Sequence, residues 1–142
     1  MATTIQIVFD CADPARLADF WAEALGYTTQ PPPPDFDSWE EWAVDMGIPE
    51  ERWNDAAAVI DPDNEGPRLF FQKVPEGKAA KNRLHLDIGI GAGVEPGQRR
   101  EAVDAESGRL TEHGASVVRH HEQRNEYWIV MQDPEGNEFC VH

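Results

Sequence analysis

The sequence predicts an α+β fold built from two similar modules, each running strand, helix and then about three strands. Two segments, 59–72 and 131–141, indicate the duplication, because both carry an Asp-Pro turn and a glycine between two apolar strands. Proline presets φ in such turns, glycine tolerates positive φ, and aspartate hydrogen-bonds its own turn backbone. Alternating hydrophobicity, typical of strands with one buried face, supports the strands. A site built between paired modules is therefore to be sought at matching positions of both.

The chain length sets the domain organisation. With 142 residues, the chain is expected to form one domain, 1–142, that buries roughly two-thirds of its unfolded surface. We place module one at about 3–76 and module two at about 82–142, joined by a short basic linker.

The balance of charged residues limits the classes of binding partner that we expect. Lys plus Arg total 12 against 27 Asp plus Glu, a net charge of −15. Such a surface repels phosphate backbones and anionic lipids, so we expect neither nucleic acid nor a membrane as partner. Cys11 and Cys140 are too few for a disulfide framework, and no apolar run is long enough to span a membrane. We therefore expect a cytoplasmic protein with reduced thiols.

Module one opens with a strand and a helix. Residues 3–10 alternate and place Ile5 and Phe9 on the inner face. Asp13 then begins a helix as N-cap, followed by a proline in the first turn, and Gly26 ends it as C-cap. This predicts a strand-to-helix unit.

An aromatic connection follows the first helix. Residues 30–36 contain four consecutive prolines and form an extended loop, after which a short helix begins at Ser38. Trp39, Trp42 and Trp53 make this connection unusually aromatic. They form either a small core beneath the loop or the wall of a ligand pocket, since aromatic planes line small-molecule sites.

The remaining elements complete the duplication. Segments 56–60 and 68–74 make a hairpin that ends module one. In module two we predict a strand at 83–90, a helix at 98–113, and three further strands at 115–120, 126–132 and 137–141. In the strand at 83–90, Leu84, Leu86 and Ile88 face inward.

The helices are expected to cover one face of the strands and to leave the other available. That other face mixes titratable groups with a few apolar side chains, which favours the lining of a cavity over simple exposure. It carries Gln6, Val8, Asp10, Phe70, Gln72, His85, Asp87, Glu138, Cys140 and His142.

Segments along most of the chain resemble a known family. They are residues 9–14, 20–21, 25–26, 69–76, 82–87 and 133–140. In this combination the chain resembles the vicinal oxygen chelate (VOC) superfamily, in its glyoxalase-like branch of the glyoxalase/bleomycin resistance/dioxygenase type. The resemblance implies two βαβββ modules that form a cupped, half-open mixed β-barrel covered by helices, with a site in the concavity. It also implies a homodimer.

Metal-dependent members of this superfamily, as the resemblance implies, hold a divalent ion on four positions. Here His85 matches, but Gln6 stands where a His is usual and Cys140 where a Glu is usual. The fourth position falls on Phe70 or Gln72, and neither is an anionic ligand. Divalent ions prefer carboxylate and imidazole ligands, and zinc accepts thiolate. We therefore expect an incomplete metal site and no glyoxalase I activity, with a divalent metal ion as the open alternative.

Two groups on this face carry chemistry of their own. His85 and Asp87 are two apart in a strand and so point to the same side. They form either a structural pair or a general base whose imidazole is fixed by the carboxylate. Cys140 is either an inert small side chain or a thiolate activated by His85.

Three functions stay open. The first is binding of a small organic molecule without metal or other cofactor. The second is a lyase, isomerase or dioxygenase that uses His85 as metal ligand or, with Asp87, as general base. The third is a scaffold whose exposed faces bind a protein. For the first, the expected ligand-binding residues are Gln6, Asp10, Trp39, Trp42, Trp53, Phe70, Gln72 and Cys140.

Overall fold

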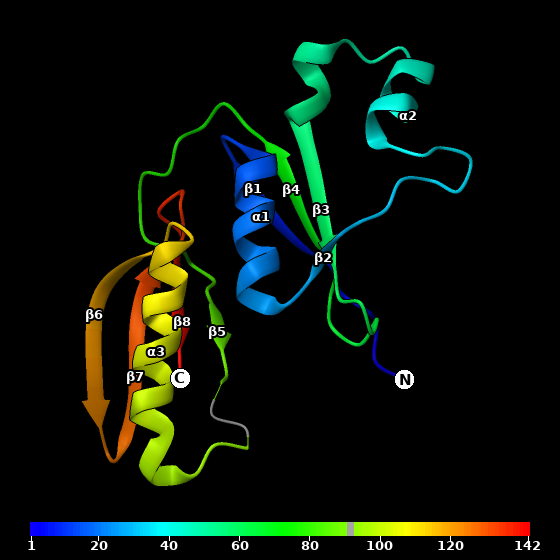
Figure 1. Ribbon diagram of the computed structural model, residues 1–142. Coiled ribbons are helices and arrows are strands. Elements are labelled where there is room, and N and C mark those ends of the chain that lie inside the picture. Colours follow the sequence, from blue (N-terminus) through cyan, green and yellow to red (C-terminus); the bar gives the residue numbers. More distant parts are fainter. Residues whose placement is uncertain (91–92) are drawn as a thin grey trace. The chain divides into compact units, whose positions relative to one another are not determined.

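The computed structural model describes residues 1–90 and 93–142. These fall into two compact units, Met1–Gly77 and Lys78–His142 (Figure 1). Each unit is described by itself below. Within the described residues, no helix has both the length and the apolar character of a membrane span.

The first unit contains one mixed sheet and its helices. Its strands run in the order β1-β4-β3-β2, with β1 parallel to β4 and the other neighbours antiparallel. In chain order the elements are β1 (Ile7–Cys11), α1 (Pro14–Leu25), β2 (Thr28–Thr29), α2 (Trp39–Asp45), the 3₁₀ helix η1 (Glu50–Asp55), β3 (Ala56–Ile60) and β4 (Leu69–Lys73).

The second unit repeats this connectivity. Its sheet has the order β5-β8-β7-β6, again with one parallel pair, β5 and β8. Its elements are β5 (Leu86–Ile88), the 3₁₀ helix η2 (Pro96–Gln98), α3 (Arg99–Glu112), β6 (Ser116–Gln123), β7 (Glu126–Gln132) and β8 (Glu138–Val141). The predicted α+β class with two βαβββ modules is thus confirmed, and the two sheets are open.

Local sequence explains helix α1. The Asp13 side chain accepts a hydrogen bond from the Arg16 N–H at 3.3 Å, and Gly26 ends the helix in the left-handed conformation at φ 68°. The apolar stripe of the helix buries Leu17 and Trp21 against β3 and β4, which lie beside it in Figure 1. The predicted caps are confirmed at both ends.

Strands β1 and β5 begin later in the sequence than predicted. Pairing of β1 with β4 starts at Ile7, so Ile5 lies outside the sheet and its side chain is 72% exposed. Strand β5 starts at Leu86, and Leu84 is 73% exposed. Both predictions of an inward side chain were wrong, because alternation continues in the sequence beyond the last residue that has a strand partner.

The Asp-Pro turns use their aspartates as predicted. Asp61 accepts hydrogen bonds from backbone N–H groups at 63, 65 and 66, and Asp133 from those at 135 and 137. The positive φ falls on Gly136 in the second turn, at 85°, but on Asn64 in the first, at 57°. Asparagine tolerates this conformation, so the glycine of the first turn is not the residue that needs it.

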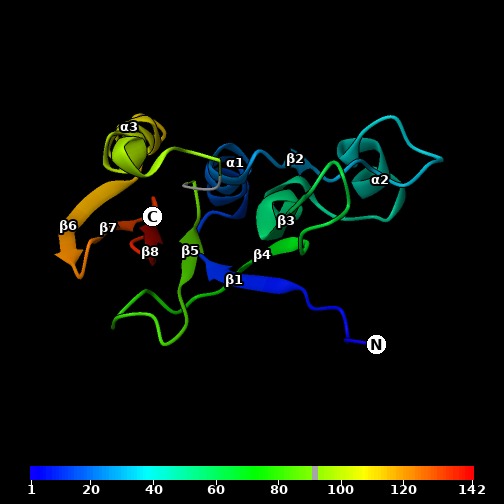
Figure 2. The ribbon, with the colours of Figure 1, turned by 90° about the horizontal axis from the view of Figure 1, so that it is seen from below.

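In each unit one sheet face is covered by a helix. Val59, Leu69 and Phe71 are buried on the α1 side of the first sheet. In the second unit α3 packs on β6, β7 and β8, as Figure 2 shows, and covers Ile129 and Met131. The opposite face of each sheet is therefore available for a site.

Candidate functional site

The first unit contains a cavity of about 700 Å³ on the sheet face away from α1. The α2–η1 segment supplies Trp39, Trp42 and Trp53 to its wall, and β4 supplies Phe70. Residues 56–58 of β3 complete the sheet side, and the small side chains of Ala56 and Ala58, on the same face as Phe70, leave the space open. The three tryptophans and Phe70 of the predicted ligand-binding set therefore line one cavity.

Hydrogen bonds and ring contacts hold two of the indoles in place. Trp39 donates from Nε1 to the carbonyl oxygen of Gln30 at 2.8 Å, and Trp53 donates to that of Ile48 at 2.9 Å. Trp39 and Trp42 meet edge to face, with ring centroids 5.4 Å apart. Within the described part of the chain, the indole N–H of Trp42 has no acceptor.

Arg68 brings a positive charge to this cavity. Its Nε donates to Oε1 of Gln30 and its Nη1 to Oε1 of Gln6, both at 2.6 Å. The guanidinium carbon lies 5.1 Å from the centre of the Phe70 ring, within the range of a cation–π contact. Among the described residues no carboxylate lies in ion-pair range of this guanidinium, so neutral amides and one ring hold it.

Three other charged side chains border the same space. Arg52 and Asp55 form an ion pair with each other at 2.9 Å. Glu40, in the first turn of α2, is exposed. Arg68 is more buried than Glu40 and is the cation here without a carboxylate partner.

The other predicted residues of the first unit lie beside the cavity. Asp10 is opposite Gln72 in the β1–β4 pair and accepts a hydrogen bond from its side-chain nitrogen at 2.6 Å. Gln6 precedes β1 and bonds Arg68. Gln6, Asp10 and Gln72 do not line the cavity itself.

The register of β1 and β4 shows which residue of the neighbouring strand lies beside Gln6. Ile7 pairs with Leu69 and Val8 with Phe70, so Arg68 is the neighbour of Gln6. A guanidinium repels a divalent cation, and a neutral amide is a weaker ligand for one than a carboxylate. With Arg68 beside Gln6, and Phe70 or Gln72 at the other position, the first unit offers no anionic ligand at the positions that the family resemblance assigns to metal ligands.

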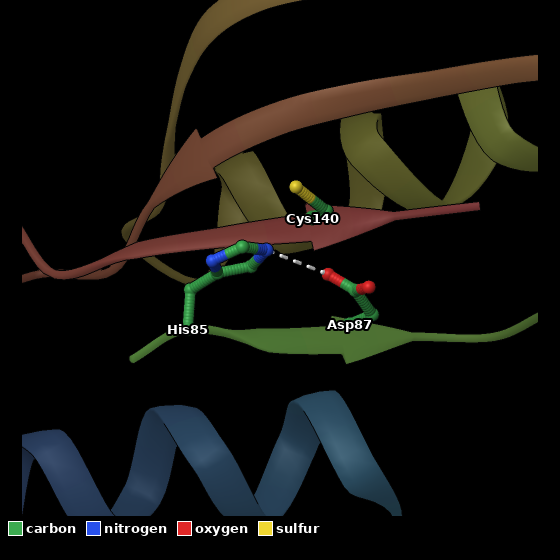
Figure 3. A group of neighbouring side chains, drawn as sticks. All are labelled: His85, Asp87 and Cys140. Atoms are coloured by element: carbon green, nitrogen blue, oxygen red, sulfur yellow. Dashed lines mark ion pairs between the residues drawn. The ribbon is translucent and has the colours of Figure 1, made fainter. Parts of the chain in front are cut away.

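The second unit gathers three possible ligands on neighbouring strands. His85 and Asp87 lie at β5 and Cys140 on β8, and the side chains point to the same side (Figure 3). His85 Nε2 is 3.2 Å from Asp87 Oδ1, and one donor atom from each residue lies within 4.8 Å of the others. Imidazole, carboxylate and thiol together suit a tetrahedral zinc-type ion, with a fourth position open.

The thiol of Cys140 is kept protonated by its surroundings. Burial raises its pKa, and the charge and hydrogen bond of the Asp87 carboxylate raise it further, against a smaller opposing effect of Lys81. An activated thiolate is therefore not favoured, and a metal ion would have to displace the thiol proton.

A second cavity, of about 890 Å³, adjoins this trio. It is bordered also by Trp128, Tyr127 and Arg100, whose guanidinium carbon is 4.5 Å from the Tyr127 ring centre. Burial and a short hydrogen bond to Asp104 raise the pKa of Tyr127 to about 12. Arg100 also bonds Glu122 at 2.7 Å, so its charge is paired within the unit.

Sequence reasoning missed several residues at these sites, above all Arg68. Its signal in the sequence is weak, since it is one basic residue at the start of a strand. Its environment depends on Gln6 and Gln30, which lie far away in the sequence. Tyr127 and Trp128 read as ordinary strand residues and were also missed.

Comparison with known proteins agrees with this architecture. The sequence matches the family described as glyoxalase-like domain over residues 6–142. A comparison with curated proteins finds no significant match.

Solved structures with low sequence identity share the fold. A hypothetical protein from S. aureus is 15% identical, with a TM-score of 0.63, and the match covers 99% of this chain and 93% of that one. The E126Q mutant of the fosfomycin resistance protein FosX from Listeria monocytogenes, complexed with Mn(II) and 1S,2S-dihydroxypropylphosphonic acid, is 11% identical, with a TM-score of 0.63 and coverage of 100% and 90%.

A bleomycin-binding protein from Streptomyces verticillus, complexed with copper(II)-bleomycin, is 16% identical, with a TM-score of 0.53 and coverage of 99% and 95%. At these identities the likeness concerns the fold alone. The family match spans nearly the whole chain and agrees with the duplicated βαβββ connectivity. The chain belongs to the glyoxalase-like domain family of the vicinal oxygen chelate superfamily.

Proposed function

We propose that this protein binds a small organic molecule in the cavity of its first unit. The observation that carries the proposal is the enclosure of about 700 Å³ by Trp39, Trp42, Trp53 and Phe70. Small-molecule sites are typically 300–1,000 Å³ in volume, roughly, and combine an apolar lining with a few polar groups. The ligand therefore has an apolar, ring-containing body.

The binding needs no metal ion in the first unit. Gln6 stands at a position where the resemblance puts a metal ligand, and its contact with Arg68 places a positive charge beside it. Proteins of the same fold offer precedent for small ligands, since structures of FosX and of a bleomycin-binding protein hold such molecules. Their ligands support the class of function and do not identify the ligand of this chain.

A thermal-shift screen of small aromatic molecules tests the proposal. Ligands that bind only the folded state raise the melting temperature, by an amount that grows with the logarithm of the ligand concentration relative to Kd. We expect hits with the wild type, loss of the shift in Trp42→Ala, and retention in Trp128→Ala, which alters the second-unit cavity. Hits that vanish in Trp128→Ala and persist in Trp42→Ala contradict the proposed location.

A second candidate function is metal-assisted or acid–base chemistry at His85, Asp87 and Cys140. It is favoured by the convergence of three donor atoms within 4.8 Å. These residues would hold a zinc-type ion, which supplies Lewis-acid chemistry when bound. Without an ion, His85 oriented by Asp87 is the candidate general base.

Titration with Co²⁺ separates the two candidates. A thiolate–cobalt absorption band that disappears in Cys140→Ser and His85→Ala supports the second, and its strength should increase with pH because the thiol must lose its proton. No band at any pH removes the metal version of this function. The homodimer and the cytoplasmic location stay predictions from the resemblance and the composition.

A further inference from the structure

The charge of Arg68 narrows the class of ligand. Resting on the function proposed above, we propose that the first-unit cavity takes a small planar aromatic carboxylate, with its ring among the tryptophans and its carboxylate on the Arg68 guanidinium.

The donors of Arg68 are only partly used by the protein. A guanidinium has five N–H groups, and two of them donate to the oxygens of Gln30 and Gln6. For the others, no acceptor is found in the described portion of the chain. The two glutamines and the Phe70 ring fix the plane of the guanidinium, so its remaining N–H donors have a fixed orientation before a ligand binds. A carboxylate matches this planar fork and forms stronger hydrogen bonds than a neutral acceptor.

Arg68 differs in this respect from three other described arginines. Arg52 pairs with Asp55, Arg100 with Glu122, and Arg109 with Glu106. The other described arginines without a carboxylate partner are exposed, whereas Arg68 is half-buried and borders an apolar cavity. A half-buried charge is costly unless it is paired, so an anionic ligand group supplies the missing partner.

The apolar part of the cavity selects the body of the ligand. Trp39, Trp42 and Phe70 offer flat faces for a ring, and the small alanine side chains of β3 leave room for it above the sheet. The Trp42 N–H is a further donor without a protein acceptor among the described residues, which also favours a ligand with acceptor atoms. A cationic ligand would lie near Arg68 and be repelled by it.

Glu40 opposes the binding of an anion, whereas Asp55, another carboxylate at this cavity, is paired with Arg52. Glu40 borders the cavity from α2, and among the described residues it is not in ion-pair range of Arg68. Because Glu40 is exposed, water screens its charge more than that of the half-buried Arg68. Removal of the Glu40 charge should therefore strengthen binding of a carboxylate modestly. The proposal thus predicts one variant with increased affinity as well as one with reduced affinity.

Calorimetric titration with three probes of one shape tests the inference. The probes are 2-naphthoate, its neutral amide 2-naphthamide, and the cation 2-naphthylmethylammonium. We expect the wild type to bind naphthoate about tenfold or more tighter than the amide, since a charged hydrogen bond is the stronger one, and to bind the cation weakest. In Arg68→Gln, we expect the preference for naphthoate to disappear while affinity for the amide changes by less than about threefold.

Two further variants keep the test decisive if Arg68→Gln folds poorly. Arg68→Lys keeps the charge but not the fork, and should retain part of the preference. Glu40→Gln should raise affinity for naphthoate by about twofold to threefold and leave the amide unchanged. Equal binding of all three probes overturns the inference but leaves the proposed function intact. Binding of none of them contradicts the proposed function as well.

Discussion

Oε1 of Gln6 accepts a hydrogen bond from Nη1 of Arg68 at 2.6 Å, between the segment that precedes β1 and the residue that precedes β4. Gln6 is one of the positions that the family resemblance assigns to a metal ligand, and Arg68 lies beside it. The contact places a permanent cation there, because a guanidinium does not lose its proton in proteins. We therefore expect the first unit to favour organic anions over divalent cations.

Restoring the usual histidine should not restore metal binding in the first unit. In Gln6→His, Arg68 still lies beside the new imidazole, so we expect the content of Mn²⁺ or Ni²⁺ after dialysis to equal that of wild type. Gln6→Glu is the matched control, since its carboxylate should pair with Arg68 and compete with an anionic ligand. Elemental analysis makes the measurement, and one added equivalent of metal in Gln6→His contradicts the account.

Asn54 ties the tryptophan-bearing segment to helix α1. It donates to Asp13 Oδ1 at 2.8 Å and accepts from the Ala15 N–H at 2.8 Å, next to Trp53. We expect Asn54→Ala to lower the free energy of unfolding by about 1 kcal/mol and to weaken ligand binding through a less ordered η1. Urea unfolding and ligand titration check both, with Glu51→Ala, at an exposed position of η1, as control. Unchanged stability and affinity would remove this role.

The stability of the second unit should depend on the charge of Glu138. Burial raises the pKa of Glu138, but hydrogen bonds from the Asn82 and Glu138 N–H groups and the Lys78 ammonium outweigh it and lower the pKa to about 2. A carboxyl with a depressed folded pKa stabilises the fold above its ordinary pKa of 4.5, and this stabilisation is lost as pH falls toward 2.

Glu138→Gln should therefore cost ~2 kcal/mol at pH 7 and much less near pH 2. Chemical unfolding across this pH range makes the comparison. Glu135→Gln, in the preceding turn, serves as the control with the same change of charge. An equal cost of Glu138→Gln at both pH values contradicts the assignment.

The reactivity of Cys140 should rise when Asp87 loses its charge. Burial, and then the Asp87 carboxylate, raise the pKa of the thiol. Asp87→Asn removes the second cause, so alkylation of Cys140 by iodoacetamide at pH 8 should become at least about twofold faster. Peptide mass spectrometry separates Cys140 from the buried Cys11. A slower reaction in Asp87→Asn would mean that Asp87 activates the thiol.

Much of the fold follows from local rules in the sequence. Asp13 and Gly26 mark the ends of α1 because capping depends on neighbouring backbone groups. The duplicated connectivity follows from the repeated turns and alternating strands. Strand β2, with two residues, has no pattern of its own and forms by pairing with β3.

The candidate site could be predicted only in part. Trp39, Trp42 and Trp53 were chosen because aromatic residues are unusual in a connection, and the structure places them around one cavity. Arg68 could not be chosen, because its role depends on Gln6 and Gln30 in other segments and on the absence of a carboxylate partner among the described residues. Long-range pairing of this kind leaves no periodic signal.

The five tryptophans allow a direct test of where the ligand binds. Protein labelled with 5-fluorotryptophan and assigned by single Trp→Phe variants is titrated with 2-naphthoate and followed by ¹⁹F NMR. We expect the Trp39, Trp42 and Trp53 signals to shift, while those of Trp21 in the core of the first unit and Trp128 at the second cavity do not. A shift confined to Trp128, or no shift at any concentration that the probe reaches, would contradict binding in the first-unit cavity.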